Sequence, residues 1–488
     1  MSQWAVVVTA TALNSIIMII QKLPYILYRS YPNFGYLTDN RNFGYDTAFH
    51  SSLKVGELLL SNTGNTFYAS LKSIPEDIEN VILRLCKLFP NVPSSVIKND
   101  ALEFFKDLYS KGFVFLGNID EYSEYISHYF SYGRKHIFEL NIPQQQINST
   151  VYKETFGKVH ALSRIHIDVS SRCNERCIHC YIPNEKKCNI MTEKIFDKVL
   201  MQCRNMNVLN LTISGGEPML NPNLKSFLLK CNKYNFSVNL LSNLTLLSND
   251  LLDIVASNPL VSVQTSLYSM DENVHDAITK CKGSFQKTMQ AIALLHERDV
   301  PLQINCPIMK QNMNSYKSVL EFANSMNIEA DSDYSLFGSY DLSCSNLQCR
   351  LSADEIEKIE NTKILKEAEL EYIRSKRTSS SDPICPVCKS SLCVSNIGDV
   401  YPCEGWQSLK LGNIEKQSLK EIWENNPLVL RLRGLTYKDF PRCNSCTYKQ
   451  YCSICLIMNA NEDLNGNYKN INTFMCDIAK IKSQRKYI

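Results

Sequence analysis

From Arg164 onward, apolar and polar residues follow the alternating periods of strands and helices. Runs of apolar and β-branched residues are separated by amphipathic stretches, which is typical of strands that alternate with helices. Strands are expected at residues 164–169, 208–213, 236–241, 261–267, 301–308 and 334–337. Helices are expected at residues 193–206, 222–234, 249–257, 284–298 and 314–326. This order predicts an α/β core in which six β-α units build a parallel sheet.

The N-terminal region has a different pattern. Residues 27–117 contain short strand patterns, two helix patterns and a closing apolar run, which predicts a small α+β domain. The strands are expected at 30–37, 43–48 and 113–116. One helix is expected to begin at Pro75–Ile78, and a second to span 101–111 and end at Gly112. Residues 118–160, rich in aromatic side chains, are interpreted as a linker with one helix at 121–132.

The first 26 residues include an uncharged apolar run from Trp4 to Ile20. Its length is near the lower limit for a membrane span, and no basic region or cleavage site marks it as a secretory signal. Three interpretations stay open: a buried segment, an extension upstream of a true start at Met18, or a membrane anchor. The Thr, Asn and Ser residues within the run disfavour the anchor, so membrane association is not expected.

Charge and cysteine content narrow the class of protein. The 52 basic and 49 acidic residues leave a net charge of +3, which gives no reason to expect a nucleic-acid partner. The chain has 20 cysteines, and many stand in closely spaced groups. Such groups indicate metal binding in a reducing compartment, so we expect a cytoplasmic protein.

One cysteine group follows the first strand of the core. Cys173, Cys177 and Cys180 lie on the segment that leaves this strand, where a loop allows three thiolates to converge. Soft thiolates suit iron–sulfur clusters or zinc, and three ligands leave one coordination position open. Cys188 lies beyond Pro183 and is not an obvious fourth ligand. A zinc knuckle completed by His179 or Cys188 remains the alternative.

A glycine turn follows the second core strand, with the sequence Ser214–Gly215–Gly216–Glu217–Pro218. Paired glycines at a strand end permit close approach of the backbone to a ligand. The cysteine motif and this turn together resemble the radical S-adenosylmethionine (radical SAM) superfamily, and the segments 275–276 and 283–285 are similar to it as well. The resemblance implies a partial (β/α)6 TIM-like barrel with a 4Fe–4S cluster on the three cysteines. It also implies that the S-adenosyl-L-methionine site includes Gly215, Gly216, Glu217, Pro218, Asn243 and Ser266.

A bridging segment, 341–384, follows the core, and a helix is expected within it at 353–377. The C-terminal region after this segment is rich in cysteines. Nine cysteines fall within residues 385–476, enough for two four-ligand sites. Their spacing resembles the SPASM extension of radical SAM enzymes, which carries two auxiliary 4Fe–4S clusters. The resemblance implies one cluster on Cys403, Cys455 and two of Cys385, Cys388 and Cys393. It implies a second cluster on Cys443, Cys446, Cys452 and Cys476.

Two features depart from that family pattern. Only two residues separate Cys452 from Cys455, where the family has three, and the first auxiliary site has one candidate thiol too many. Two zinc-ribbon sites are the alternative to auxiliary clusters. Glu404 directly follows Cys403, at the place where sulfatase-maturing relatives have a carboxylate base, and the resemblance implies a catalytic role for it.

The expected protein therefore has a domain of 27–117, a radical SAM core of 161–340 and an iron–sulfur domain of 385–488. The first domain is similar to winged-helix, PqqD-like elements that bind the leader of a precursor peptide as an added strand. The resemblance implies an enzyme that abstracts hydrogen from a ribosomally made peptide and forms a thioether or carbon–carbon cross-link. An electron donor such as flavodoxin or ferredoxin would serve it. The alternatives are a sulfatase-type formylglycine maturase and, in another class, a non-catalytic zinc scaffold or DNA-binding regulator.

Overall fold

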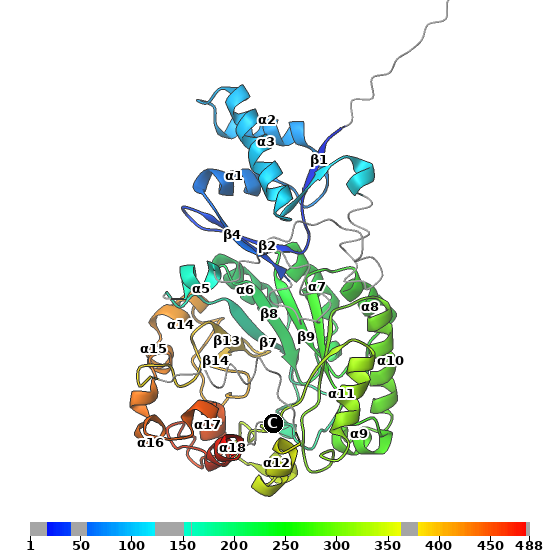
Figure 1. Cartoon of the computed structure of the whole chain (residues 1–488), viewed down its shortest axis with the longest axis vertical. Helices are drawn as coiled ribbons and strands as arrows, with labels where there is room; N and C mark the ends of the chain where they lie inside the picture. Colours follow the sequence, from blue (N-terminus) through cyan, green and yellow to red (C-terminus); the bar gives the residue numbers. More distant parts are fainter. Residues whose placement is uncertain (1–16, 41–55, 123–150, 158, 363–378, 485–488) are drawn as a thin grey trace, which may run out of the picture. The chain divides into compact units, whose positions relative to one another are not determined.

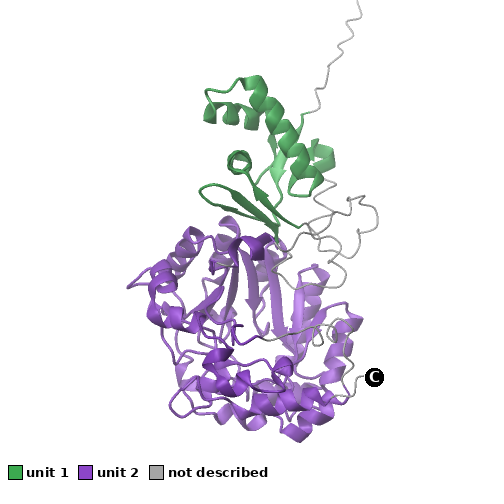
Figure 2. Ribbon diagram, turned by 60° about the vertical axis from the view of Figure 1, so that its left-hand side comes forward, with its two compact units in different colours: residues 1–39, 55–148 green, residues 40–54, 149–488 purple. Residues whose placement is uncertain are grey.

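The computed structural model describes residues 17–40, 56–122, 151–157, 159–362 and 379–484 (Figure 1). The chain divides into two compact units (Figure 2). Unit 1 comprises residues 1–39 and 55–148, and unit 2 comprises residues 40–54 and 149–488.

Unit 2 is built on one nine-stranded sheet in the order β12-β11-β10-β9-β8-β7-β13-β14-β15. Six of its strands are parallel neighbours: β7 (Arg164–Ser170), β8 (Asn210–Gly215), β9 (Ser237–Leu241), β10 (Val261–Ser266), β11 (Leu302–Asn305) and β12 (Glu329–Asp331). The chain returns much later to add β13 (Ser391–Val394), which pairs in parallel with β7. Two antiparallel strands follow, β14 (Asp399–Tyr401) and β15 (Gly412–Asn413). The predicted α/β core is confirmed.

Alternation along β7 separates the two faces of the sheet. Ile165 and Ile167 are fully buried and belong to one apolar core with Phe196 and Phe227 of the covering helices. His166 and Asp168, at the alternate positions, point to the opposite face. The helices of this core are α5 (Val151–Phe156), α6 (Glu193–Asn205), α7 (Leu224–Lys233), α8 (Asn249–Ala256), α9 (Glu272–Thr279), α10 (Ser284–Glu297) and α11 (Tyr316–Ser325).

Two details of the core differ from the sequence-based expectation. The sixth strand is β12 at 329–331, where it pairs with β11, and residues 334–337 form no strand. Tyr334 and Leu336 are nonetheless buried, so their apolar pattern reflects packing without a neighbouring strand. Helix α9 was not among the expected helices.

The C-terminal part of unit 2 shares the apolar core of the barrel sheet. Its helices are α12 (Ala353–Glu360), α14 (Leu419–Asn425), α15 (Pro427–Arg433), α16 (Pro441–Asn444), α17 (Leu456–Asn461) and α18 (Thr473–Ser483). Trp406, Leu419 and Val429 belong to the same core cluster as Ile165 of β7. Helix α12 begins with a capping box at Ser352 and Glu355. The rest of the predicted helix at 353–377 lies largely outside the described residues.

Unit 1 is a small α+β unit with a core of its own. Two antiparallel three-stranded sheets have the orders β5-β1-β6 and β2-β3-β4. Its elements are β1 (Ile19–Lys22), β2 (Ile26–Ser30), β3 (Gly35–Asp39), β4 (Glu57–Leu60), α1 (Asn62–Ser70), β5 (Glu76–Asp77), α2 (Ile78–Leu88), α3 (Ser94–Ser110) and β6 (Val114–Gly117).

Several N-terminal expectations change in unit 1. The single strand expected at 30–37 is two strands, β2 and β3, joined by a turn in which the Tyr31 amide donates to the Phe34 carbonyl. The end of the apolar run 4–20 enters β1, and residues 4–16 lie outside the described part. The expected strand at 43–48 and nearly all of the helix at 121–132 also lie outside it. No helix among the described residues has the length and apolar character needed to cross a membrane.

Candidate active site

The three cysteines of the first motif line one cavity of about 260 Å³ at the carboxyl edge of the sheet. Cys173, Cys177 and Cys180 are half-buried in the loop that leaves β7. The buried Glu175 holds this loop in shape: its amide faces Cys173 Sγ at 3.4 Å, and its Oε2 accepts from Cys177 Sγ at 3.2 Å. Cys188 is exposed and does not line the cavity.

The glycine turn after β8 packs directly against the backbone that leads into this loop. The Gly216 amide donates to the Ser170 carbonyl at 2.6 Å. A Cβ at Gly216 would lie 2.4 Å from the carbonyl oxygen of Arg172, and one at Gly215 would be closer still to Ser170. Gly215 also has a φ of +127°, a conformation that favours glycine. Both glycines line the cavity, so the turn positions the cysteine loop and forms part of the cavity wall.

The wall across from the cysteines comes from the next strand ends. Asn243 after β9 and Ser266 at the end of β10, which the sequence analysis assigns to cofactor binding, line the cavity. Asn243 Nδ2 donates to Asn174 Oδ1 at 3.0 Å, so this residue also fixes the cysteine loop. Its carbonyl accepts from Thr288 of α10 at 2.9 Å. The carboxyl ends of neighbouring parallel strands therefore surround one site.

Glu217 and Pro218 do not line this cavity. The Glu217 carboxylate is fully buried and accepts from Ser242 Oγ, the Asn243 amide and the Met219 amide at 2.8–2.9 Å. It ties the end of β9 to the glycine turn. Burial raises the pKa of Glu217 to about 7. Its geometry is that of a positioning residue, because its oxygens are already occupied by neighbouring donors.

Burial also sets the protonation of the cavity wall. It raises the pKa of the Cys173 thiol to about 12 and that of Glu175 to about 7, and it lowers that of His179 to about 4. The Cys173 thiol is therefore protonated in the metal-free protein at neutral pH. A bound iron cluster would compensate the burial by stabilising the thiolates.

A second cavity of about 590 Å³ fills the interior of the barrel. Polar side chains of neighbouring strands face into it, among them His166 of β7, Thr212 of β8 and Asn239 of β9. The two cavities share walls, because His179, Tyr181, Ser214, Leu241, Gln264 and Asn305 line both. A group bound among the three cysteines would lie next to a molecule in the barrel.

Glu404 lies on the wall of this barrel cavity. Its Oε2 accepts from Cys403 Sγ at 3.0 Å. Burial alone would raise the pKa of Glu404, but the neighbouring His166 holds it below its ordinary value. The carboxylate is therefore ionised and faces the space that a substrate would fill.

The four cysteines of the predicted second auxiliary site lie close together. Cys443, Cys446, Cys452 and Cys476 line one small cavity of about 50 Å³ beside Tyr437 and Met475. They come from α16, α18 and the segment between α16 and α17, so a shared ligand would hold these parts together. Their arrangement fits a cluster in the predicted position.

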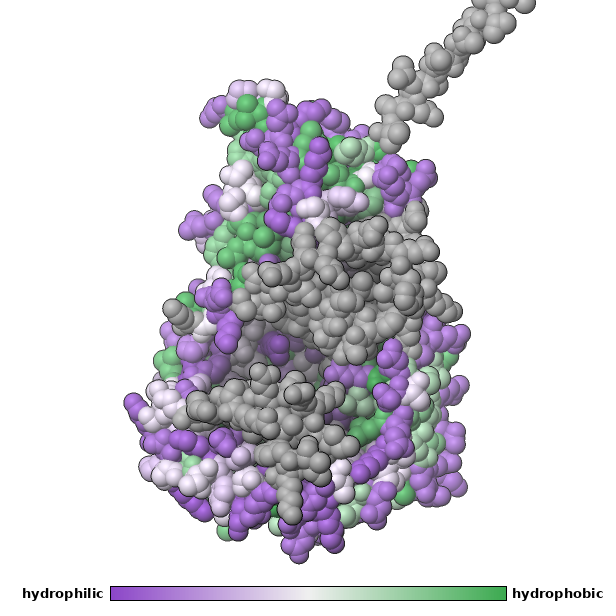
Figure 3. Space-filling model, in the orientation of Figure 1, coloured by the Kyte–Doolittle hydropathy of each residue, from purple (hydrophilic) through white to green (hydrophobic). Residues whose placement is uncertain are grey.

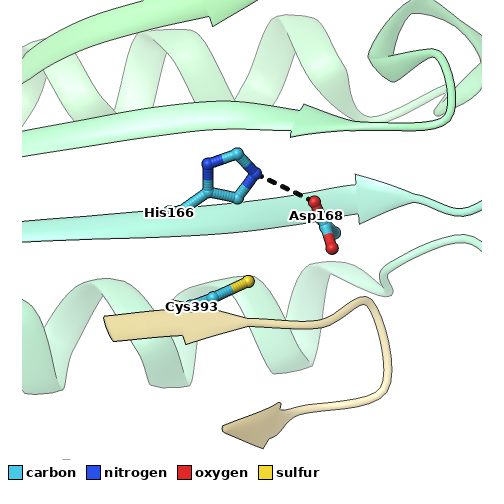
Figure 4. A group of neighbouring side chains, drawn as sticks. All are labelled: His166, Asp168 and Cys393. Carbon is cyan, nitrogen blue, oxygen red and sulfur yellow. Dashed lines mark hydrogen bonds and ion pairs between the residues drawn. The ribbon is translucent and has the colours of Figure 1, made fainter. Parts of the chain in front are cut away.

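The candidate thiols of the first auxiliary site divide into two groups. Cys385 and Cys455 act electrostatically on Cys403, and Cys388 lies near Cys385. Cys388 has a φ of +55°, an uncommon conformation for a residue with a side chain. Cys393 also interacts electrostatically with Cys403, but it lies on β13 in register with His166. Its ligand atom is within 4.8 Å of those of His166 and Asp168 (Figure 4).

The spacing of the thiols also bears on the zinc-ribbon alternative. Four thiolates on one zinc ion lie about 3.8 Å apart, given a Zn–S distance near 2.3 Å. In the described part of the chain, the one group of three or more ligand atoms within 4.8 Å of one another is His166, Asp168 and Cys393. By that measure, no three of the described C-terminal cysteines are gathered as tightly as the ligands of a single zinc ion.

Several residues of the first cavity were not singled out from the sequence, among them Glu175, Lys187, Tyr268 and Thr279. Glu175 lies between Cys173 and Cys177, and Lys187 follows the cysteine motif. In a loop sequence, charged residues like these indicate solvent-exposed positions. Tyr268 follows β10, and its hydroxyl lies 3.4 Å from His179 Nε2. Polar residues just beyond strand ends were the available signal, but such residues are common in loops that have no function.

Comparison with known families matches both regions of the site. The model of the radical SAM superfamily matches residues 167–323, and that of the SPASM iron–sulfur cluster-binding domain matches residues 385–447. The chain therefore contains a radical SAM domain and a SPASM domain. The first binds S-adenosyl-L-methionine and a 4Fe–4S cluster, and the second binds further iron–sulfur clusters.

Among characterised proteins, AdoMet-dependent heme synthase of Methanosarcina barkeri is 24% identical over 320 residues, 59% of this chain and 89% of that protein. PqqA peptide cyclase of Bradyrhizobium diazoefficiens is 24% identical over 61% of this chain and 81% of its own length. The antilisterial bacteriocin subtilosin biosynthesis protein AlbA of Bacillus subtilis is 24% identical over 61% and 67%.

Among solved structures, Streptococcus suis SuiB bound to the precursor peptide SuiA aligns with a TM-score of 0.55 and 16% identity. The alignment covers 92% of this chain and 98% of SuiB. At this identity the likeness establishes the fold.

Proposed function

We propose that this chain, an enzyme with a radical SAM domain and a SPASM domain, modifies a ribosomally synthesised precursor peptide by hydrogen abstraction. The observation that carries the proposal is the shared wall between the thiol-lined cavity and the polar barrel cavity. A radical generated in the first cavity would meet a peptide side chain in the second without crossing solvent. The relatives named for a peptide cyclase and for bacteriocin biosynthesis support a peptide substrate.

In this proposal Cys173, Cys177 and Cys180 hold the catalytic 4Fe–4S cluster. When bound, the cluster and S-adenosyl-L-methionine supply a 5′-deoxyadenosyl radical. Gly215, Gly216, Asn243 and Ser266 form the cofactor wall, and Glu217 holds that wall in place through Ser242 and Asn243. The cavity fits the cofactor in kind, because three thiols, two backbone-exposing glycines and polar side chains converge on it.

We further propose the ligands of two auxiliary clusters. Cys443, Cys446, Cys452 and Cys476, which line one cavity, would hold one cluster. Cys385, Cys388, Cys403 and Cys455 would hold the other, since Cys393, although near Cys403, also lies with its ligand atom within 4.8 Å of those of His166 and Asp168. These clusters would accept the electron left on the peptide after hydrogen abstraction or bind a substrate thiolate. An external donor such as flavodoxin or ferredoxin would reduce the enzyme in the cytoplasm.

The peptide would enter the barrel beside Glu404, which is placed to accept a proton from it. Loss of one hydrogen atom and one proton, with one electron passed to an auxiliary cluster, leaves a new bond. The product would be a thioether or carbon–carbon cross-link. A formylglycine maturase would use the same carboxylate, but that function would not explain the presence of unit 1.

Unit 1 is proposed to bind the leader of the precursor. In the described residues β4 is the last strand of its sheet and pairs with β3, and the leader would add to the sheet beside β4 as an extended peptide. Figure 3 shows hydrophobic atoms gathered over the region of β2 and β4 on one face. Leu59 of β4 is 42% exposed and would supply an apolar contact beside the backbone hydrogen bonds. Tethering the leader raises the effective concentration of the core peptide at the barrel.

A triple variant tests the assignment of the catalytic cluster. Replacing Cys173, Cys177 and Cys180 by Ala should abolish formation of 5′-deoxyadenosine, because no ligand for the cluster remains. Iron should fall from about twelve to about eight atoms per chain, since the C-terminal clusters stay. Both quantities are measured on one anaerobic preparation. Wild-type cofactor cleavage in the variant contradicts the assignment, and complete loss of iron from a folded chain contradicts the auxiliary clusters.

A further inference from the structure

Three side chains of different chemistry meet where the barrel joins the C-terminal part of unit 2. His166 and Asp168 occupy successive positions on one face of β7, and Cys393 lies opposite His166 on β13. Their ligand atoms all lie within 4.8 Å of one another, and Figure 4 shows the three side chains converging. His166 Nε2 and Asp168 Oδ1 are 3.0 Å apart, close to the separation of two ligands on one metal ion.

A hydrogen bond from Gln407 and the pairing of β7 with β13 fix the geometry of these three side chains. Gln407 Nε2 donates to Asp168 Oδ2 at 2.7 Å, which leaves Oδ1 directed at His166. Hydrogen bonds of this kind orient the carboxylate ligands of metal ions in proteins. The two strands themselves are paired in register at Cys393 and His166. Asp168 and Cys393 are buried at 5% and 0% exposure.

The proposed clusters also do not need Cys393 as a ligand. Cys385, Cys388, Cys403 and Cys455 suffice for a four-ligand auxiliary site. The strongest electrostatic neighbour of Cys393 is Asp168, followed by Glu404 and then Cys403. A buried thiol beside an imidazole and a carboxylate matches the mixed sulfur, nitrogen and oxygen ligands of zinc.

We propose that His166, Asp168 and Cys393 form a separate mononuclear zinc site at the wall of the barrel cavity. A neutral imidazole, a carboxylate and a thiolate balance the charge of Zn²⁺, so the buried site carries no net charge. Binding releases the Cys393 thiol proton to solvent, together with the His166 ring proton wherever the imidazole is charged. His166 and Glu404 both line the cavity, so the fourth coordination position faces it and takes water or a donor atom of a molecule in the barrel. This site goes beyond the proposed function, and only the availability of Cys393 rests on the proposed cluster ligands.

Metal analysis of the cluster-loaded enzyme tests the site. The protein is equilibrated with Zn²⁺ and a weak chelator, and zinc and iron are measured together for wild type, Cys393→Ala and Cys231→Ala. Cys231 is a fully buried thiol of α7 and serves as the matched control. We expect about one zinc per chain in wild type and control, and a loss of at least tenfold in Cys393→Ala with unchanged iron. Zinc-edge X-ray absorption should show one sulfur among nitrogen and oxygen ligands.

Gln407→Ala gives a second, milder variant. Loss of the hydrogen bond to Asp168 should weaken zinc binding by about 10–100-fold while iron stays constant. Three results would overturn the site. Zinc content could be equal in wild type and Cys393→Ala. Iron could fall by one cluster in Cys393→Ala, which would make Cys393 a cluster ligand. The zinc spectrum could show three or four sulfur ligands, which would place the zinc in a vacated cluster site.

Discussion

At the scale of single residues, the site depends on how closely two backbones approach. Gly215 and Gly216 lie against residues 170–172, the segment that delivers Cys173 to the cavity. Their role is therefore double: they free the cavity wall of side chains, and they set the position of the cysteine loop. A side chain at either position has no space unless that loop moves.

Gly216→Ala is predicted to disable the site without removing any ligand. The new Cβ would meet the Arg172 carbonyl oxygen at 2.4 Å, so the cysteine loop must shift. Overpacking of this kind costs about 1–3 kcal/mol. Binding of S-adenosyl-L-methionine should weaken at least tenfold, measured by equilibrium dialysis of the cluster-loaded enzyme.

Gly434→Ala is the matched control for this prediction. Gly434 caps α15 at a φ of −79°, and its new Cβ would meet nothing closer than 3.3 Å. Cofactor binding should therefore stay at the wild-type level. Equal binding by Gly216→Ala and Gly434→Ala would show that the loop tolerates displacement, contrary to this account.

At the scale of elements, two helices hold the cofactor wall from behind. The Asp276 carboxylate of α9 accepts from Ser284 Oγ at 2.8 Å and from the Phe285 amide at 2.9 Å, and so caps the first turn of α10. Thr288, one turn further along α10, donates to the Asn243 carbonyl. The start of α10 is thereby linked to a residue of the cofactor wall.

Asp276→Ala is predicted to destabilise α10 and loosen this link. Loss of a capping side chain costs about 0.5–2 kcal/mol, which should lower the midpoint of thermal unfolding by a few degrees. Burial would raise the pKa of Asp276, but hydrogen bonds from Phe285 and Gly283 hold it below the ordinary value. Its stabilising effect is lost only as the pH falls through that low pKa. The difference from wild type should thus be constant from pH 5 to pH 8, and a difference that vanishes within this range would contradict the capping role.

At the scale of the whole molecule, one unit carries all the proposed chemistry. Every proposed cluster ligand and cofactor contact lies in unit 2. Unit 1 has its own apolar core, and β4 is the last strand of one of its sheets among the described residues. Chemistry and leader recognition should therefore be separable.

Removing residues 1–117 deletes all the described strands of unit 1. The truncated enzyme should keep its iron and its slow cleavage of S-adenosyl-L-methionine without peptide, because no proposed ligand is lost. Modification of the full precursor should fall at least tenfold, because the leader is no longer tethered. Adding the excised segment as a separate chain should restore little. Undiminished modification by the truncated enzyme would remove the recognition role from unit 1 and favour the formylglycine maturase.

The local pattern of apolar and polar residues predicted many of the helices and strands, but it could not predict the pairing between distant segments. Strands β7 to β11 follow from their alternating residues, as do the helices between them except α9. The parallel pairing of β13 with β7 joins residues more than 220 positions apart, and no local period indicates it. That pairing is what separates Cys393 from the other candidate cluster ligands. Likewise Glu217 stands in the expected motif, but its carboxylate faces Ser242 and Asn243, which only the fold reveals.

The central claim is that the radical formed among Cys173, Cys177 and Cys180 abstracts hydrogen from a peptide in the adjoining barrel. The most direct test incubates the cluster-loaded enzyme and S-adenosyl-L-methionine with a precursor peptide deuterated at its core residues, drawn from short reading frames beside this gene. Mass spectrometry then follows both products. We predict deuterium in 5′-deoxyadenosine and a peptide that has lost two hydrogens in a cross-link. Deuterium-free 5′-deoxyadenosine beside an unchanged peptide, for every such precursor, would contradict the account.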